Sequence, residues 1–368
     1  MGDGMKLPGR AYIEETCPQE RGWAAVAGKK RKKKKPAGEA GRCLAVSLLL
    51  MGLLFLLPVV TGPGAGESSG VEPEPEPITL LSPGEADGAE TLRVLTGETV
   101  EEMTLGEYLT GVLRAEMPAS FHQQALCAQA VAARTYTRYQ LSGGSRHGDT
   151  ADICTDHTCC QAFMTAEAAA AGWGAEAERN EARVANAVAE TDGQTIFYGG
   201  EPILAVFHSS SAGRTKAAGS VWAEDLPYLR SVESPEGEDV PNYYSRVDFT
   251  PQEFRELLLA AEPSADLSGP CGVWIGETVR ADGGVETVEI GGVTLRGSRV
   301  RSIFGLRSAT FDTEAGPEDV SFSVPGYGHG VGLSQYGAQT MALAGHTWRE
   351  IIAHYYTGVT VEPWPGGA

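Results

Sequence analysis

Basic residues are scarce over most of this chain. Residues 1–60 hold 11 of the 29 Lys and Arg but only 5 of the 48 Asp and Glu, which leaves 18 basic residues against 43 acidic ones beyond them. Such an excess of negative charge repels phosphate backbones, so we do not expect this part of the chain to bind nucleic acid.

Two further absences narrow the class of protein. Five of the seven cysteines follow residue 60, and an odd number excludes a framework in which every cysteine is paired. No repeat of fixed period is present, which argues against a solenoid or a propeller.

One long apolar run, residues 43–60, follows a basic block at residues 29–35. As a helix its 18 residues span about 27 Å, close to the roughly 30 Å hydrocarbon core of a bilayer. We predict a single uncleaved transmembrane helix; a cleaved signal peptide is the alternative, although its apolar core is usually about 7–15 residues. The basic block should stay in the cytoplasm, so residues 1–42 are expected to be a cytoplasmic tail of a membrane protein whose remainder lies outside.

Beyond this run the composition changes twice. Residues 61–90 are rich in Gly, Ser, Pro and acidic residues, which favours an extended extracytoplasmic linker. Residues 91–364 mix helical and strand patterns, and we predict a mixed α+β domain. The clearest signals are a strand at 92–95, capping boxes at 104–107, 120–123 and 347–350, helical segments at 165–190 and 334–344, and hairpins within 195–208 and 285–295.

Glu116 lies where the first helix of this domain should end. Pro118 disfavours helical geometry at the residue before it, so the chain is expected to turn a corner there into the next helix. From the residues alone, the simplest role of a glutamate at such a corner is to cap a helix.

Four polar or glycine-rich segments lie beside apolar stretches: residues 115–118, 147–160, 208–215 and 326–338. In this order they resemble the stage II sporulation protein D family, which is related to the amidase-enhancer proteins of bacterial cell walls. The resemblance covers about residues 90–362 and is most specific in YGHGVGLSQYGA, residues 327–338. The N-terminal anchor and the external orientation also fit that family.

The resemblance implies a lytic transglycosylase, which cleaves between N-acetylmuramic acid and N-acetylglucosamine of peptidoglycan without water and leaves a 1,6-anhydro end. In the family the catalytic glutamate precedes Met-Pro, which places it at Glu116. A single carboxyl group suits this reaction, because it can protonate the glycosidic oxygen and then take the proton of the C6 hydroxyl. Its pKa should be raised by partial burial near Met117 and Phe121.

A cluster of histidine and cysteine lies within residues 147–160. Neutral imidazole and thiolate together suit tetrahedral zinc, and a closed set of four ligands would be structural. Some family members hold zinc here with two Cys and two His, but this chain has Cys159 where that pattern has histidine. We predict His147, Cys154, Cys159 and Cys160 as ligands, with His157 as the rival to Cys159. A local disulfide of Cys154 with Cys159 or Cys160 is the alternative, which an extracytoplasmic site permits.

The two later segments offer groups that can contact a sugar. After an apolar strand, Ser209, Ser210, Ser211 and Arg214 present hydroxyl donors and a guanidinium, or form only a turn stabilised by hydroxyls. No Gly-x-Ser-x-Gly pattern surrounds these serines, which argues against a serine hydrolase.

The glycine-dense loop that follows should let backbone approach a ligand closely. No βαβ unit surrounds it, so we reject a nucleotide-binding loop. His329 either supports Glu116 or is structural, and the candidates for stacking and hydrogen bonds to pyranose rings are Tyr327, Gln335 and Tyr336.

The sequence therefore predicts an external domain with a substrate groove around Glu116. As the resemblance implies, the groove should prefer glycan strands whose stem peptides are already removed, with a peptide-stripping amidase or endopeptidase as partner. In a sporulating cell this places the protein in engulfment, in the intermembrane space. The first rival is a non-catalytic peptidoglycan-binding module that stimulates an amidase. The second, a zinc-dependent wall hydrolase, is disfavoured because four filled ligand positions leave no place for water.

Overall fold

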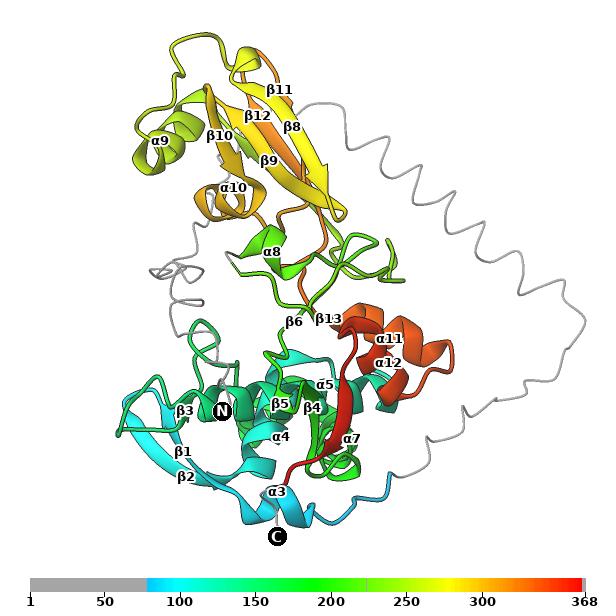
Figure 1. The fold of residues 1–368 in the computed structure, drawn as a ribbon. Coiled ribbons are helices and arrows are strands. Elements are labelled where there is room, and N and C mark those ends of the chain that lie inside the picture. Colours follow the sequence, from blue (N-terminus) through cyan, green and yellow to red (C-terminus); the bar gives the residue numbers. More distant parts are fainter. Residues whose placement is uncertain (1–77, 223, 366–368) are drawn as a thin grey trace, which may run out of the picture. The chain divides into compact units, whose positions relative to one another are not determined.

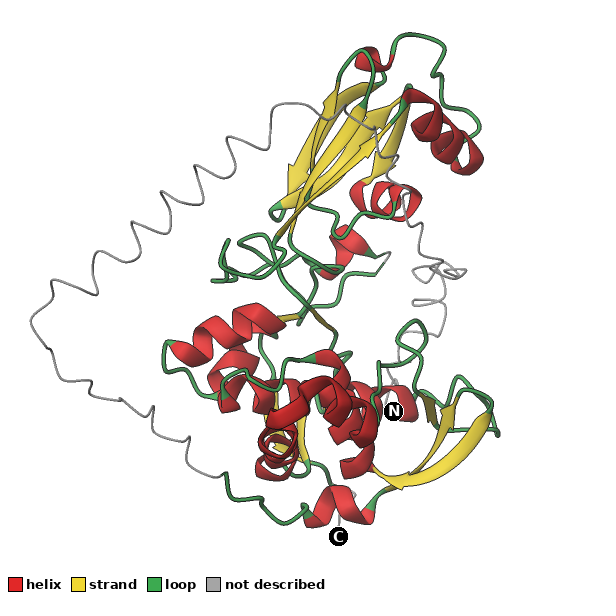
Figure 2. Cartoon of the chain, turned by 180° about the vertical axis from the view of Figure 1, so that it is seen from behind, coloured by secondary structure: helices red, strands yellow, loops and turns green. Residues whose placement is uncertain are grey.

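The computed structural model describes residues 78–222 and 224–365 (Figures 1 and 2). The predicted cytoplasmic tail at 1–42, the predicted transmembrane helix at 43–60 and the linker as far as residue 77 lie outside these residues. Within the described ranges no helix combines the length and the apolar character needed to cross a bilayer. The described residues form a mixed α+β structure, as the sequence predicts.

The helix α5 (Gln123–Ser142), most of whose residues are buried, lies at the centre of the first hydrophobic core. Its small residues, among them Ala125, Ala128 and Ala132, are fully buried and let other helices approach closely. The helices that contact it are α4 (Leu105–Glu116), α7 (Ala177–Glu190), α11 (Gln335–Leu343) and α12 (Trp348–Tyr355). The short helices α6 (Ala166–Trp173) and η1 (Gly174–Glu176) lead into α7.

Small sheets complete this first core (Figure 1). In one sheet β1 (Thr91–Thr96) pairs with antiparallel β2 (Thr99–Thr104) and parallel β3 (Ile153–Cys154). In another, β4 (Gln194–Tyr198) lies between β14 (Thr360–Pro363) and β5 (Glu201–Pro202). The third joins β6 (Phe207–His208) in parallel to β13 (Leu333–Ser334), which brings two of the sequence segments of interest together.

A second hydrophobic core is built from residues 244–325 and is rich in aromatic rings. Phe254, Phe304 and Phe322 pack against one another with ring centroids 4.5–6.3 Å apart. Two sheets contribute to it: β7 (Tyr244–Phe249) with β12 (Val320–Pro325) and β11 (Asp312–Ala315), and β8 (Ile275–Ala281) with β9 (Gly284–Ile290) and β10 (Val293–Arg296). The helical segments are α9 (Pro251–Ala261), η2 (Cys271–Val273) and α10 (Gly297–Phe304), while α8 (Ala218–Val221) precedes this region.

Local signals in the sequence predict many of these boundaries. The capping boxes at Thr104 and Thr347 are present, and Ser334 caps α11. The capping box predicted at 120–123 is wrong: His122 is the N-cap of α5, and its Nδ1 accepts the N–H of Gln124 at 3.2 Å. The hairpin within 285–295 is confirmed as β9 and β10. The hairpin predicted within 195–208 is confirmed only for β4 and β5, because β6 pairs with β13 instead.

The end of the predicted linker is part of the folded structure. Residues Glu85–Ala89 form the short helix α3, and Asp87 is buried against α5. Both carboxylate oxygens of Asp87 accept hydrogen bonds from the guanidinium of Arg134 at 2.6–2.9 Å, and Arg134 is itself fully buried. The extended conformation predicted as far as residue 90 therefore does not hold for α3, since a buried arginine requires a carboxylate partner there.

We expect Asp87→Ala to lower the free energy of unfolding by about 3–5 kcal/mol, because it leaves the Arg134 charge buried without its partner. Urea unfolding followed by circular dichroism measures the change. The matched control is Asp225→Ala, which breaks the exposed ion pair with Arg230 and should alter stability little. Equal effects of the two substitutions would contradict the structural role of Asp87.

Candidate functional site

Glu116 is the last residue of α4, at the corner that the sequence predicts. The next residue, Met117, leaves the helix with φ −130° and ψ 136°, and Pro118 follows. The Glu116 side chain is partly buried. Its Oε1 accepts the backbone N–H of Ala162 at 3.2 Å, and its Oε2 accepts from Nε2 of Gln335 at 3.5 Å.

The surroundings of Glu116 favour its neutral form. Burial raises the pKa of Glu116 above its usual range, while the hydrogen bonds from Ala162 and Gln335 act in the opposite direction. A carboxyl group in this position can both donate a proton when neutral and be stabilised as the anion by two donors. Those are the properties of a group that serves as acid and then as base.

Glu116 lines a cavity of about 1500 Å³. Residues of both hydrophobic cores contribute to its walls, including Trp222 of the first core and Leu295 of the second. Ser209 and Tyr327 also line it. Among the described lining residues, Glu116 is the one that carries a carboxyl group. Asp152 and Asp156 are acidic residues of the 147–160 segment that could have assisted Glu116, but neither lines the cavity. Asp152 binds Arg93, and Asp156 caps the turn at Thr158.

The three predicted serines have different positions. Ser209 lines the cavity, whereas Ser210 and Ser211 are buried. Ser210 exchanges two backbone hydrogen bonds with Tyr327, at 3.0 and 2.8 Å. Arg214 is exposed, lies outside the cavity lining and pairs with Glu233 at 3.7 Å.

A buried network that sequence reasoning missed connects these loops. His208 Nε2 lies 2.6 Å from Ser211 Oγ, and its Nδ1 lies 3.2 Å from the carbonyl oxygen of Val331. Since only a protonated Nδ1 can donate to that carbonyl, Nε2 accepts from the serine hydroxyl. Burial lowers the pKa of His208 to about 3, which keeps the imidazole neutral.

Glu236 anchors the other end of this network. Its buried Oε1 accepts the N–H of Ser211 at 2.6 Å and a short hydrogen bond from the hydroxyl of Ser334. Ser334 caps α11, whose first residue is Gln335, so Glu236 helps to fix the side chain that reaches Glu116. Its partners are 25 and 98 positions away, and a local pattern carries no signal for such contacts.

The first turn of α11 is crowded as well. A Cβ atom at Gly337 would lie 1.9 Å from the hydroxyl oxygen of Tyr355 and 2.7 Å from Oε2 of Glu236. Only glycine fits at this position, because such distances are far below van der Waals contact.

The glycine-dense loop is shaped by contacts within the protein. Gly328 and Gly332 have φ of 114° and 72°, a region that side chains disfavour. A Cβ atom at Gly332 would lie 2.2 Å from the carbonyl oxygen of Val206, and one at Gly328 would lie 2.7 Å from the Cβ of His208. The close backbone approach expected toward a ligand is thus seen toward the segment that contains β6.

The polar side chains of this loop separate into two groups. Tyr327 and Gln335 line the cavity, and Tyr327 is half exposed. Tyr336 instead packs edge-on against Phe121, with ring centroids 5.0 Å apart.

His329 has a structural environment. Its Nδ1 accepts the N–H of Val331 at 3.0 Å, and a second hydrogen bond joins its ring to the backbone of Phe207. Its ring lies against Trp222 and His208, with centroids 5.4 and 5.6 Å away. Burial lowers its pKa to about 4, so the ring is neutral and contributes shape to the cavity wall more than charge.

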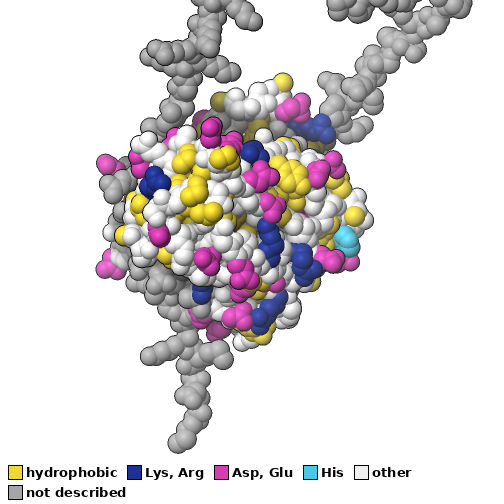
Figure 3. Space-filling view, turned by 90° about the horizontal axis from the view of Figure 1, so that it is seen from above, with side chains coloured by type: hydrophobic (Ala, Val, Ile, Leu, Met, Phe, Trp, Pro, Cys, Tyr) yellow, Lys and Arg dark blue, Asp and Glu magenta, His cyan; other side chains and the backbone are white. Residues whose placement is uncertain are grey.

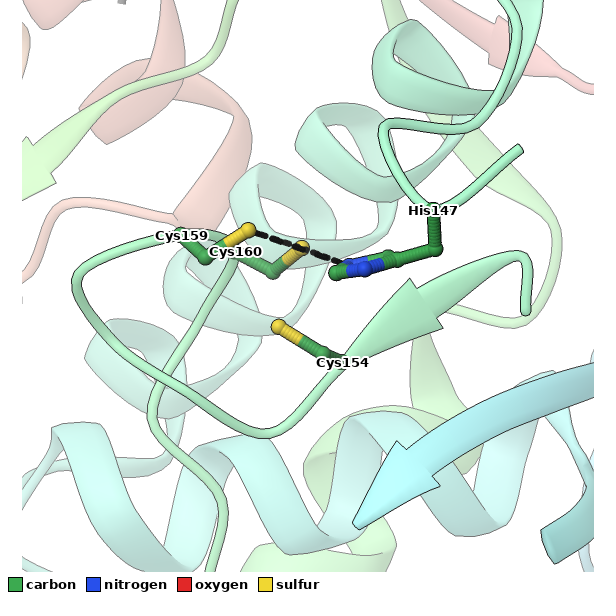
Figure 4. A group of neighbouring side chains, drawn as sticks. All are labelled: His147, Cys154, Cys159 and Cys160. Atoms are coloured by element: carbon green, nitrogen blue, oxygen red, sulfur yellow. Dashed lines mark hydrogen bonds between the residues drawn. The ribbon is translucent and has the colours of Figure 1, made fainter. Parts of the chain in front are cut away.

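The four predicted metal ligands come together in space (Figure 4). The imidazole nitrogen of His147 and the sulfur atoms of Cys154, Cys159 and Cys160 all lie within 4.8 Å of one another. His157, the rival of Cys159, is largely exposed, pairs with Asp156 and is not in this group. Three thiols and one imidazole are a donor set that suits tetrahedral zinc.

The cluster is connected to Glu116 through two residues of the chain. Cys160 is followed by Gln161, whose amide donates to the hydroxyl of Thr137 at 3.0 Å, and then by Ala162, which donates its N–H to Glu116. Whatever fixes the sulfur of Cys160 therefore also fixes a hydrogen-bond donor of the carboxyl group.

Comparison with known proteins finds relatives along most of the chain. A family profile described as "Stage II sporulation protein" matches residues 96–198. Stage II sporulation protein D of Bacillus subtilis (strain 168) is 34% identical over 328 residues, which cover 86% of this chain and 93% of the relative. The protein of the same name from Bacillus amyloliquefaciens is 34% identical, with the same two shares covered. The amidase enhancer of B. subtilis is 26% identical over 302 residues, 69% of this chain and 40% of its own length.

Proposed function

Because the chain belongs to the stage II sporulation protein D family, we propose that it is a lytic transglycosylase of peptidoglycan with Glu116 as its acid and base. It cleaves the bond between N-acetylmuramic acid and N-acetylglucosamine in strands whose stem peptides have been removed. The observation that supports this best is the partly buried Glu116, the one carboxyl group among the described residues that line the cavity.

The reaction needs one carboxyl group and no water. Neutral Glu116 donates its proton to the glycosidic oxygen as the bond from the muramic acid C1 breaks. The C6 hydroxyl of the same sugar then attacks C1, and the Glu116 carboxylate takes the hydroxyl proton. A hydrolase would ordinarily use a second carboxylate about 5–9.5 Å away, and the described cavity lining supplies none.

The donors around Glu116 serve the anionic stage. Ala162 and Gln335 hold the carboxylate oxygens after the first proton transfer, while burial favours the neutral form before it. Burial favours neutral Glu116, and the two hydrogen bonds favour its carboxylate. The neutral and ionised forms of Glu116 therefore differ less in free energy than either effect alone would make them. A group that must give and then recover a proton requires this balance.

The His147, Cys154, Cys159 and Cys160 cluster is the proposed zinc site. With four protein ligands the ion would be structural and would activate no water. Its contribution would be to hold residues 154–162 in place, and with them the Ala162 donor.

The proposed cellular location rests on the sequence and on the family. Residues 43–60 would anchor the chain once in the cytoplasmic membrane, with residues 61–77 as linker and the folded part outside. In a sporulating cell this is the intermembrane space during engulfment. The proposed partner is an amidase or endopeptidase that strips stem peptides before this enzyme acts.

We expect the full-length chain to release glycan ends that carry 1,6-anhydro-N-acetylmuramic acid from peptide-free strands. Mass spectrometry of the products measures this, because anhydro and reducing ends differ by one water. Reducing ends would show a hydrolase instead. Binding without cleavage, together with faster action of an added amidase, would favour the enhancer-like alternative suggested by the more distant relative.

A further inference from the structure

Three arginines lie along one wall of the cavity: Arg296 at the N-cap of α10, and Arg299 and Arg301 within it. They face a lining in which Glu116 is the one described carboxyl group. The wall is therefore basic, although the chain beyond residue 60 has 43 acidic residues against 18 basic ones. On the face shown in Figure 3, by contrast, acidic and basic side chains are interspersed.

The helix that carries this wall is fixed at both ends. Its first residue, Gly297, touches β9 so closely that a Cβ atom would lie 2.1 Å from the carbonyl oxygen of Val285. Its last turn ends at Gly305 in the left-handed conformation, with φ 63°. Between them Val300 and Phe304 are buried in the second core, whereas Arg296 and Arg299 are exposed.

Two of the guanidinium groups are held in place by the protein. Arg299 donates from Nε to Glu262 at 2.9 Å and from an Nη to the carbonyl oxygen of Ala261 at 3.2 Å. Arg301 donates from Nε to the carbonyl oxygen of Leu306 at 3.2 Å. An arginine has five N–H donors, so Arg299 keeps donors beyond its two contacts with Glu262 and Ala261. Arg301 contributes its positive charge to the wall. Arg296 is exposed, and its side chain forms no hydrogen bond or ion pair within the described ranges.

A solvated helix face is the simpler explanation of exposed arginines, but two observations favour a binding surface. Ser298, Ser302 and Thr294 line the same wall and add hydroxyl groups between the arginines. The positive charge of Arg301 also acts on two groups farther inside the protein. Together with burial, which is the larger cause, it lowers the pKa of Lys216 to about 8 and that of His329 to about 4. Positive potential thus extends into the cavity, where an anion would be attracted.

We propose that the Arg296, Arg299 and Arg301 wall is a subsite for the carboxylates of an acidic glycan, which selects strands whose lactyl carboxyl groups are free. The identity of the polymer rests on the proposed function. A stem peptide converts the lactyl carboxyl group into a neutral amide, and its removal restores the negative charge. Guanidinium groups recognise carboxylates through charge-assisted hydrogen bonds that an amide cannot reproduce. The wall thereby reads the chemical difference between peptide-bearing and peptide-free strands.

The test measures binding, which does not depend on cleavage. The full-length chain with Glu116→Gln is titrated with peptide-free strands and with the same strands after their carboxyl groups are converted to methylamides. We expect the amidated strands to bind at least about tenfold more weakly, the size expected for the loss of one charge-assisted hydrogen bond. Adding Arg296→Gln and Arg301→Gln should weaken binding of the charged strands similarly and remove the discrimination between the two ligands.

Two controls keep this test decisive. Arg296→Gln alone alters an exposed side chain without partners among the described residues, so a loss of discrimination there cannot come from misfolding. Arg246→Gln changes an exposed arginine of β7 outside the cavity and should leave both affinities unchanged. Equal binding of charged and amidated strands would overturn the proposed subsite. So would inorganic phosphate that displaces the charged strands no better than the amidated ones, because phosphate should compete only for the arginines. A chain that discriminates but never cleaves would retain the subsite and lose the proposed transglycosylase activity.

Discussion

Glutamine at position 116 is expected to lower the rate of glycan cleavage by about 10²–10⁴-fold, the usual contribution of a well-placed acid and base. Glutamine keeps the volume of the side chain and can still accept the Ala162 N–H, but it cannot transfer a proton. The release of anhydro ends from peptide-free strands, followed over time, measures the effect. The matched control is Glu101→Gln, an exposed residue of β2, which should cleave at the normal rate.

The same substitution should not destabilise the fold at neutral pH. Because burial raises the pKa of Glu116, the contribution of this group to stability is present at low pH and is lost as the pH rises through that pKa. A neutral glutamine removes the cost of burying the charged carboxylate, so the melting temperature of the Glu116→Gln chain should equal or exceed that of the unchanged chain.

The rate of cleavage by the unchanged chain should decline as the pH rises through the raised pKa of Glu116, since the neutral acid disappears. Full cleavage by the Glu116→Gln chain would end the assignment.

Removing the Cys/His cluster should affect both stability and cleavage. We expect Cys154→Ser to lose the proposed zinc ion, to melt at least about 5 °C lower and to cleave far more slowly, because residues 154–162 carry the Ala162 donor to Glu116. A shift of that size corresponds to a loss of roughly 3 kcal/mol in a folded part of this length. Metal analysis, thermal unfolding and product release measure the three effects.

Asp149→Asn is the matched control for the cluster, since it changes an exposed loop side chain two positions from His147 and leaves the four donors intact. Chelation of the unchanged chain should reproduce the loss of stability. A metal-free preparation with paired cysteines and unaltered melting would establish the disulfide alternative instead.

Much of the fold could be predicted from local patterns. Helix starts at Thr104 and Thr347 follow from capping boxes, and the corner at Glu116 follows from Pro118, because these signals act within a few residues. The resemblance to the sporulation family, read from residues 327–338 and three other segments, is confirmed by relatives that match most of the chain. The sequence also placed together the four side chains of the cluster.

The parts that escaped prediction depend on contacts between distant residues. Glu236 is an ordinary acidic residue in the sequence, and its burial beside Ser211 and Ser334 appears only when three loops meet. Ser210, Ser211 and Arg214 are all polar loop residues in the sequence, yet the first two are buried and the third lies outside the cavity lining, paired with Glu233. The composition of residues 85–89 predicts linker and not the helix α3, because composition alone cannot show that Arg134 requires a buried carboxylate partner there.

The crowding around Gly337 limits how this protein can evolve. Any mutation there forces Tyr355 or Glu236 aside, and α11 would carry Gln335 away from Glu116. Natural variants should therefore be rare at this position, while an exchange at the exposed Arg296 should alter strand selection and leave the fold intact. Substitutions on and next to α10 can therefore change which glycan strands bind, whereas substitutions at Gly337 of α11 would disturb the site around Glu116.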